Sequence, residues 1–134
     1  RHYQLEHLQH RHRLAPALAL ALDEGAAIAP EDFAAARERL EFARKQADYL
    51  FSDCDAWLMP SAQGAAPKGF GTTGDPVFNR LVTALHLPAI NLPVYRNKHR
   101  MPLGLQLVGA RHQDEKLLAT AARLMDVMRN TAQV

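Results

Sequence analysis

The hydrophobic spacing of the chain changes near residue 53, and this change requires a fold that combines helices with strands. Before this point, apolar residues recur every three or four positions in two stretches separated by Gly25 and Pro30, which predicts two helices. The first expected buried face comprises Leu5, Leu8, His12, Ala15, Ala19 and Leu22, and the second comprises Phe33, Ala36, Leu40, Ala43, Ala47 and Leu50. Pro16 interrupts the first pattern, so we expect a kink or a new helix start there.

Short apolar runs after residue 53 predict strands. The run 55–60 is typical of a buried strand, and 88–95 predicts a second strand in which Pro93 favours an edge or a bulge. Leucines alternate over 103–109 with the period of a strand, and the basic connector 96–102 would join the last two strands as a hairpin. A short helix is expected over 77–85.

A last helix is expected from Asp114, which is suited to cap it. Its apolar face would contain Leu117 or Leu118, Ala121, Leu124, Met125 and Met128. The predicted fold class is therefore mixed α/β, in which N-terminal helices precede a small mixed sheet and a C-terminal helix.

The length of 134 residues fits a single segment, 1–134, with a helical part, 1–53, followed by strands, a pocket loop and the final helix over 54–134. Apolar residues make up 48% and charged residues 22% of the chain, which is typical of a globular protein. A single cysteine, Cys54, suits a reducing compartment. No signal peptide or membrane span is recognisable, so we expect a cytoplasmic protein that does not bind membranes.

The formal net charge of +2 is too small to indicate a nucleic-acid binder. Arg96, Lys98, His99 and Arg100 cluster in the basic connector, but four such residues are more typical of a solvated hairpin turn. We therefore expect no direct contact with nucleic acid.

Seven histidines prompt a search for a metal site. His7 and His10 are three residues apart and could share a ligand on one helix face. Neither a carboxylate nor a cysteine completes a set at a recognisable spacing, so the sequence predicts no metal and no other cofactor. His86, His99 and His112 stand alone at expected turns, where capping or solvation is the usual role.

A catalytic nucleophile is not evident either. Cys54 lies between two acidic residues, which disfavours a reactive thiolate. Ser52 and Ser61 lack the glycine-flanked context of a nucleophile elbow, and no spacing singles out a pair of carboxylates. Residues 61–76 hold four of the seven glycines, which fits either a binding loop or a simple connector. From the residues alone, the chain contains no self-contained catalytic constellation.

Five segments from Asp55 onward form an ordered series. They are Asp55–Pro60, Thr73–Asn79, Leu87–Pro93, Met101–Gly109 and Asp114–Leu124. In this order they resemble a strand, a pocket segment, a closing strand pair and the last helix at the C-terminal end of amidase-signature enzymes. The resemblance implies that the chain is a fragment of the amidase-signature fold.

Enzymes of that family hydrolyse amides with a serine nucleophile, a second serine in a cis peptide and a lysine base. These three residues belong to a glycine- and serine-rich stretch that precedes the matching segments. The sequence contains no such stretch, and Lys45, Lys68, Lys98 and Lys116 lie in other contexts. The resemblance therefore implies an amidase parent, with no catalytic residue in this fragment and no activity for the fragment alone.

The same resemblance implies that this region forms one wall of the acyl pocket, beside Met59. The predicted substrate-binding residues are Thr72, Thr73, Asp75, Phe78 and Asn79. Family members that take glutamine hold its amino group with a carboxylate in this neighbourhood, and Asp75 is the nearest acid. The alternative for Asp75 is a structural one, as the N-cap of the helix over 77–85.

Three functions remain open at this stage: the C-terminal portion of an amidohydrolase, part of the A-type subunit of a glutamyl-tRNA amidotransferase, or a non-catalytic binding or assembly module. The expected partners are a small amide substrate in the complete enzyme and further copies of the chain, because severed strands present unpaired edges. His86 stands where the family usually has glycine, so a different local turn is expected there.

Overall fold

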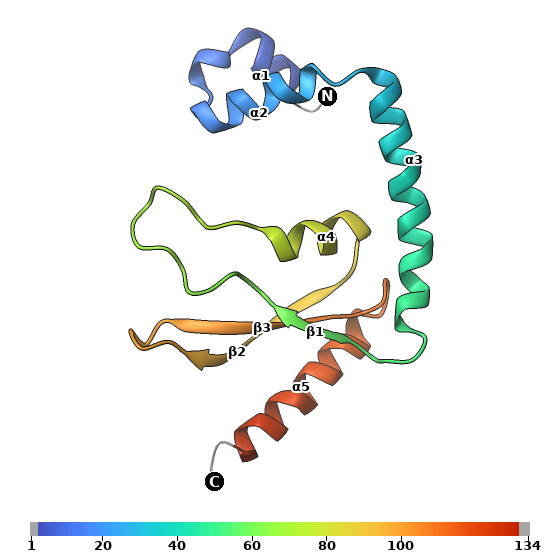
Figure 1. Cartoon of the computed structure of the whole chain (residues 1–134), viewed down its shortest axis with the longest axis vertical. Helices are drawn as coiled ribbons and strands as arrows, with labels where there is room; N and C mark the ends of the chain where they lie inside the picture. The colour runs from blue at the N-terminus through green and yellow to red at the C-terminus, as the bar shows by residue number, and fades with distance from the viewer. Residues whose placement is uncertain (1–2, 132–134) are drawn as a thin grey trace. The chain divides into compact units, whose positions relative to one another are not determined.

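The computed structural model describes residues 3–131. The chain divides into two compact units, Arg1–Arg39 and Leu40–Val134, which we call the N-terminal unit and the sheet unit. The N-terminal unit contains α1 (Gln4–Gln9), a short 3-10 helix η1 (Arg11–Arg13), α2 (Pro16–Ala26) and the first part of α3 (Pro30–Ala47) (Figure 1). Pro16 is the first residue of α2, where its missing N–H and fixed φ are tolerated. The expected break at Pro16 is therefore confirmed as a new helix start.

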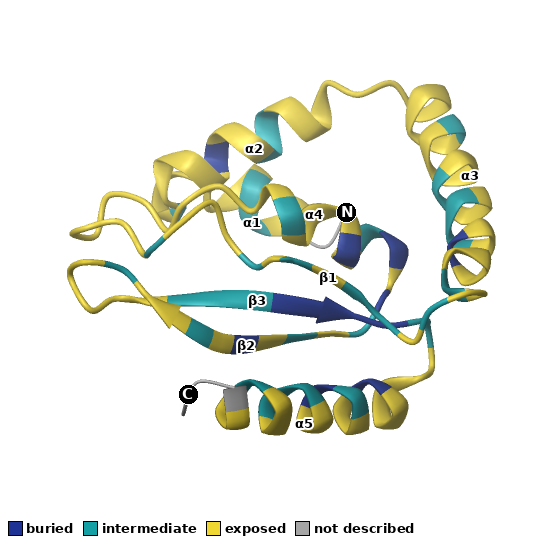
Figure 2. Ribbon diagram, turned by 60° about the horizontal axis from the view of Figure 1, so that its bottom comes forward, coloured by how far each residue is buried: buried dark blue, intermediate teal, exposed yellow. Residues whose placement is uncertain are grey.

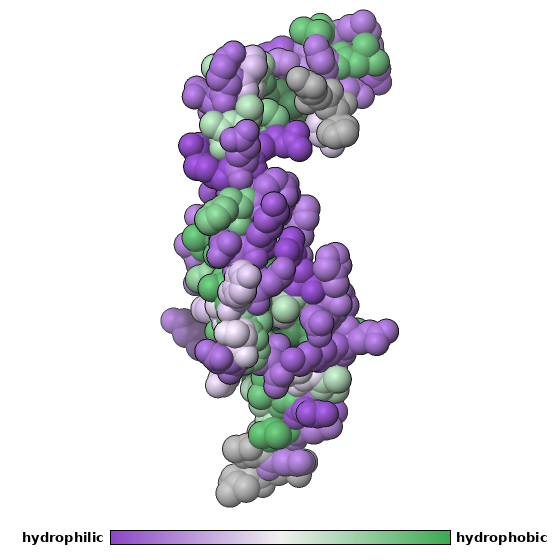
Figure 3. Space-filling view, turned by 90° about the vertical axis from the view of Figure 1, so that its right-hand side faces the viewer, coloured by the Kyte–Doolittle hydropathy of each residue, from purple (hydrophilic) through white to green (hydrophobic). Residues whose placement is uncertain are grey.

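The N-terminal unit does not form the single buried face expected from the spacing of its apolar residues. Only Ala19 of that set is buried, whereas Leu5 and Leu8 are 57% and 72% exposed. The reason is local: η1 and the extended Leu14 separate α1 from α2, so the two helices do not continue one stripe. Apolar side chains are consequently visible at the surface of this unit, near the top of Figure 3.

The sheet unit is built on three antiparallel strands in the order β1-β3-β2, with β1 at Trp57–Pro60, β2 at Ala89–Arg96 and β3 at Pro102–Val108. Trp57 and Ala89 both lie opposite Val108 in the central strand. The helices-plus-small-sheet fold class is confirmed, but the strands described are all antiparallel, not mixed. β1 and β2 are both antiparallel to β3. For β2, the hairpin connection over 96–102 requires this direction.

Each face of the sheet has its own apolar cluster (Figure 2). On one face, α5 (Asp114–Thr131) packs Leu117 and Ala121 against Leu92 and Leu107. On the other face, Val108 is fully buried among residues of α4 (Val77–Leu85) and the end of α3. Leu117 is 3% exposed and its neighbour Leu118 is 57% exposed, which decides between the two expected core positions.

The edge strands differ from the expectations in one respect. An edge or a bulge was predicted for β2, and the structure shows both, because β2 is an outer strand and its register shifts between Pro93 and Tyr95. The predicted strand within 55–60 is confirmed as β1, which begins at Trp57, but the expectation that it is buried is wrong, since Leu58 is 54% exposed. The cause is that β1 lies at an edge while α5 packs mainly on β2 and β3.

Helix α3 buries only the C-terminal half of its expected face. Ala47 is 1% exposed, and Leu40 and Ala43 pack beside it, but Phe33 is 54% exposed. Leu50 is 46% exposed because α3 ends at Ala47 and a tighter 3-10 helix, η2 (Asp48–Phe51), breaks the spacing. Within residues 3–131, none of the helices has the length and apolar character needed to cross a membrane.

His86 ends α4 in the left-handed conformation, with φ of 57° and ψ of 36°. The backbone N–H of His86 donates to the carbonyl of Thr83, and that of Leu87 donates to the carbonyl of Val82. This pair of bonds is the Schellman motif, in which glycine is the favoured residue at the left-handed position. The turn therefore keeps the geometry that a glycine would adopt, and His86 adopts it with a side chain.

Candidate functional site

The loop over 61–76 leaves β1, returns to α4, and is anchored at its start. The Ser61 hydroxyl donates to the carbonyl of Gly104 in β3 at 3.1 Å. The side-chain amide of Asn79 on α4 donates to the carbonyl of Ser61 at 3.3 Å. Ser61 thus ties the base of the loop to the sheet, and Asn79, one of the predicted substrate-binding residues, ties it to α4.

The two threonines of the candidate site lie further along this loop, and both are exposed. The hydroxyl oxygen of Thr72 accepts from the backbone N–H of Gly74 at 3.0 Å. Gly74 has a φ of 95°, a region that side chains disfavour, so the loop turns sharply just before α4. Thr73 remains exposed within this turn.

Asp75 does not cap α4. The N-cap position is Pro76 and no side chain bonds to the helix start, so the structural alternative for Asp75 is wrong. The reason is that Pro76 is inserted between Asp75 and the first turn and takes the position that the aspartate would need. The Asp75 carboxylate instead lies 3.8 Å from the guanidinium of Arg80, on an exposed surface.

Phe78 is half-buried at the start of α4. A shallow depression of about 340 Å³ lies on the surface of the same helix, and Phe78 is not part of its lining. Its lining includes Asn79 and Arg80. The structure therefore places the predicted residues on one continuous segment, with Asn79 beside the loop base and Asp75 beside Arg80, while Thr72 and Thr73 lie on the exposed loop.

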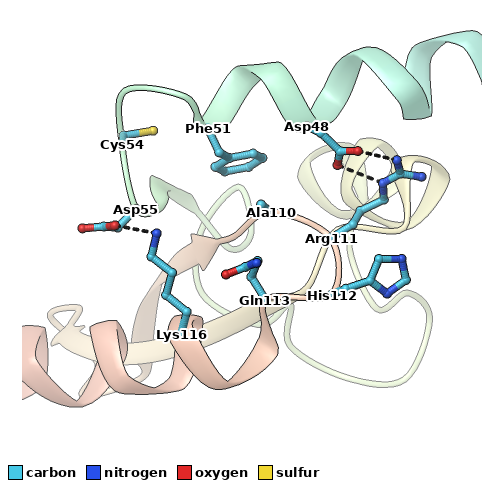
Figure 4. A pocket seen from close by; sticks show the side chains of 9 residues that line it. All are labelled: Asp48, Phe51, Cys54, Asp55, Ala110, Arg111, His112, Gln113 and Lys116. Atoms are coloured by element: carbon cyan, nitrogen blue, oxygen red, sulfur yellow. Dashed lines mark hydrogen bonds and ion pairs between the residues drawn. The ribbon is translucent and has the colours of Figure 1, made fainter.

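A second cavity, of about 330 Å³, lies at the start of α5 and was not expected from the sequence. Figure 4 shows its two ion pairs. Nε and Nη2 of Arg111 donate to the two carboxylate oxygens of Asp48 at 3.1 and 2.6 Å, and Nζ of Lys116 lies 2.7 Å from the carboxylate of Asp55. The hydrogen bond from Arg111 lowers the pKa of Asp48, and the hydrogen bond from Lys116 lowers the pKa of Asp55.

The two ion pairs join different elements of the fold, and the cavity lies where these elements meet. They connect η2 and the segment before β1 to the β3–α5 turn and the first turn of α5. Asp48 and Arg111 are 63 positions apart, so no local spacing in the sequence could have indicated the pair. Arg111 and Lys116 each have a carboxylate partner, so both cations of these ion pairs are engaged in contacts between elements.

Gln106 is the one buried polar side chain of the core found among the described residues. It is 5% exposed in the middle of β3, and its Nε2 has no hydrogen-bond partner in the described part of the protein. It lies opposite Asn91 in β2 and Met59 in β1. A glutamine among alternating leucines was the available sequence signal for this position, and it was missed.

Of the two histidines considered as a metal-ligand pair, His7 makes another contact. Nε2 of His7 lies 2.8 Å from the carboxylate of Asp23, which also pairs with Arg11. Over residues 3–131, the structure shows no group of three or more His, Cys, Asp or Glu side chains arranged to hold a metal ion.

Comparison with known proteins decides the family. The sequence profile of the Amidase family matches residues 6–118, which is most of the chain. The chain belongs to the Amidase family. The recognition based on the five ordered segments is thereby confirmed.

Curated relatives carry a more specific name. The chain is 34% identical over 88 residues to the A-type subunit of the glutamyl-tRNA(Gln) amidotransferase from Wolinella succinogenes, a match that covers 60% of this chain and 19% of that protein. It is 37% identical over 84 residues to the protein of the same name from Psychrobacter cryohalolentis, covering 58% of this chain and 17% of that protein. The chain thus spans about one fifth of the length of these relatives.

Solved structures agree on the fold. One amidase crystal structure superposes with a TM-score of 0.82 and 26% identity, covering 92% of this chain and 31% of that chain. A 6-aminohexanoate cyclic dimer hydrolase complexed with substrate superposes with a TM-score of 0.54 and 20% identity, covering 72% of this chain and 24% of its own, and shows the fold alone. The amidase fold is therefore present, over a part of the length of these enzymes.

Proposed function

We propose that this chain is the C-terminal portion of an amidase-signature amidohydrolase that hydrolyses a carboxylic amide to an acid and ammonia or an amine. The observation that carries the proposal is the amidase match, which includes 92% of this chain but only 31% of the solved enzyme. In this proposal the catalytic serines and lysine belong to the remaining part of the enzyme, the fragment alone is inactive, and the complete enzyme is cytoplasmic.

In the complete enzyme, Thr72, Thr73, Asp75, Phe78 and Asn79 would line the acyl pocket and contact the amide substrate. The loop anchor supports this assignment, because the bonds from Ser61 to Gly104 and from Asn79 to Ser61 fix where the segment starts and ends. The exposed hydroxyls of the threonines and the half-buried ring of Phe78 then supply polar and apolar surface to one side of a ligand.

A chimera tests the proposal. The segment of the solved amidase that matches this chain is replaced by residues 1–134, and hydrolysis of the enzyme's own amide substrate is measured. We expect hydrolysis by the chimera and none by the isolated chain. Substitution Asn79→Ala in the chimera should raise KM about fivefold, the value of one hydrogen bond, whereas Asn130→Ala on the exposed side of α5 should leave KM unchanged. Hydrolysis by the purified fragment alone would contradict the proposal.

A second candidate is the A-type subunit of a glutamyl-tRNA amidotransferase, supported by the names of the curated relatives. In that case Asp75 would hold the amino group of glutamine. The two candidates separate in the same chimera: release of ammonia from glutamine that is lost on Asp75→Asn, but retained on Asp126→Asn, favours the amidotransferase. Equal turnover of simple amides by both variants favours the free amidase.

A further inference from the structure

Ser61 is not among the predicted substrate-binding residues, yet it makes three hydrogen bonds that join different elements. Its hydroxyl donates to the carbonyl of Gly104 at 3.1 Å, and its backbone N–H donates to the same carbonyl at 3.5 Å. Its own carbonyl accepts from Nδ2 of Asn79 at 3.3 Å. Ser61 therefore connects the central strand β3, the start of the loop and helix α4 (Figure 1).

The part of the loop that follows Ser61 has no comparable support. Within the described structure, residues 62–71 make no hydrogen bond or ion pair. Gly69 has a φ of 91°, and the ring of Phe70 beside it is fully exposed. Ser61 is therefore the point at which the loop is fixed to the sheet.

The acceptor that Ser61 uses on β3 is itself held in place. Gly104 lies opposite Pro93 of β2, which has no N–H that could compete for the carbonyl. A side chain at position 104 would collide with the amide of Asn91, and glycine within a strand often marks such a close approach. The central strand thus offers Ser61 a carbonyl at a fixed position.

The bond to Ser61 also decides how the amide of Asn79 is oriented. A backbone carbonyl can only accept, so the group of Asn79 that faces Ser61 is its NH2. Oδ1 is the other end of the amide, and no hydrogen bond reaches it from residues 3–131. Because Asn79 is exposed, this oxygen is available as an acceptor beside the loop.

We propose that Ser61 is a positioning residue of the acyl pocket, and that Oδ1 of the Asn79 amide accepts a hydrogen bond from a donor on the acyl part of the substrate. This inference rests on the proposed function, because it takes Asn79 as part of the acyl pocket. An apolar acyl group would cover Oδ1 and leave it without a partner, which is unfavourable. The substrate class is therefore amides whose acyl part carries a donor, such as a hydroxyl or an amine.

The positioning role is tested on the chain 1–134 itself, by NMR of the side-chain amide of Asn79. One of its two protons should exchange with water more slowly than the other, both in this chain and in Ser61→Thr, which keeps the hydroxyl. In Ser61→Ala the same proton should exchange about fivefold faster, the value of one hydrogen bond. Ser52→Ala, at an exposed position outside the loop, is the matched control and should change nothing. Equal exchange in Ser61→Ala and Ser52→Ala would overturn the role of Ser61.

The substrate class is tested by binding, which does not require turnover. The chimera described above is titrated with straight-chain amides and with counterparts in which a hydroxyl or a methyl ether replaces the terminal methyl group. At the matching chain length, the hydroxyl amide should bind about fivefold more tightly than the unsubstituted amide. The ether, which accepts but does not donate, should gain nothing. Asn79→Ala should abolish the preference and Ser61→Ala should reduce it, whereas Ser61→Thr and Ser52→Ala should keep it.

The possible failures are distinguishable. Equal binding of hydroxyl and unsubstituted amides at every chain length, tighter binding of the ether, or no binding at all would overturn the substrate class. A preference lost as fully in Ser61→Thr as in Ser61→Ala would overturn the role of the Ser61 hydroxyl. A chimera that binds these amides with the expected preference but does not hydrolyse them would contradict the proposed function, while the roles of Ser61 and Asn79 would stand.

Discussion

The N-terminal unit and the sheet unit are held together in different ways. Among residues 3–131, nine of the ten buried apolar residues lie in the sheet unit, and only Ala19 lies in the N-terminal unit. The sheet unit has two apolar clusters, one on each face of the sheet. In the N-terminal unit, the side-chain contacts described between α1, η1 and α2 converge on Asp23, which pairs with His7 and Arg11.

This difference shows which part of the chain specifies its own fold. Burial of apolar area stabilises at roughly 25 cal/mol per Å², whereas an exposed ion pair contributes about 1 kcal/mol or less. The sheet unit therefore has the means to fold independently. The N-terminal helices expose leucines, so burial of apolar area stabilises them less than it stabilises the sheet unit.

The largest expected effect comes from placing a charge in the core of the sheet unit. Val108→Asp puts a carboxylate at a fully buried position where it has no cation to pair with, and should cost about 3–5 kcal/mol of unfolding free energy. Urea denaturation monitored at Trp57 measures this loss. The matched change Leu20→Asp, at a position of α2 that is 59% exposed, should leave the same transition within about 0.5 kcal/mol. A similar loss for both variants would show that the two units fold as one.

The next largest expected effect is a gain in stability. The Nε2 of Gln106 is buried without a partner in the described part of the protein, and such a donor costs about 1–3 kcal/mol. Gln106→Met keeps the length of the side chain and removes the polar group, so it should raise the unfolding free energy of the sheet unit by about 1 kcal/mol or more. The control Gln63→Met, on the exposed loop, should have no effect. A loss of stability for Gln106→Met would show that its amide is satisfied in solution.

A smaller gain in stability is expected from a substitution at the end of α4. His86 adopts a left-handed conformation that costs a residue with a side chain about 1–2 kcal/mol. Glycine would avoid this cost, but the greater freedom of glycine in the unfolded chain offsets about half of the gain. His86→Gly should therefore stabilise the sheet unit by about 0.5–1 kcal/mol. Ala84→Gly, two residues earlier in α4, should instead destabilise it by about 1 kcal/mol. Thermal unfolding followed by circular dichroism distinguishes the two signs.

The sequence predicted the sheet unit better than the N-terminal unit, for physical reasons. In α5 one face is buried, so the spacing of Leu117, Ala121 and Leu124 reports directly on the structure. The alternating leucines of β3 lie on the face that α5 covers at Leu107, although the opposite face is buried as well at Val108. Pro93 also restricted β2 to an edge with a bulge. In α1 and α2 the apolar spacing carried no such information, because most of those residues are exposed.

The candidate site was predictable only as a segment. Local motifs located the loop over 61–76 and α4, but the contacts that hold them join residues far apart in the sequence, such as Ser61 with Gly104 and Asn79 with Ser61. Those pairings depend on strand register and helix placement, which no local pattern encodes. The failure of Asp75 to act as an N-cap depended on the neighbouring Pro76, which takes that position.

The smallest expected effect is an acid transition confined to the N-terminal unit. Hydrogen bonds from Arg11 and His7 lower the pKa of Asp23 from 3.8 to about 2. The folded unit therefore binds its proton less readily than the unfolded chain, so the contribution of Asp23 is complete above about pH 4 and is lost as the pH falls toward 2. Carbon chemical shifts of α1 and α2 should report a loss of helix over this range, while β3 is unchanged. Asp23→Asn should remove the transition and the neighbouring Glu24→Gln should retain it, because the side-chain hydrogen bonds that reach α2 from α1 and η1 within residues 3–131 end on Asp23. If β3 and α2 lost structure together in acid, the separate stability of the two units would be refuted.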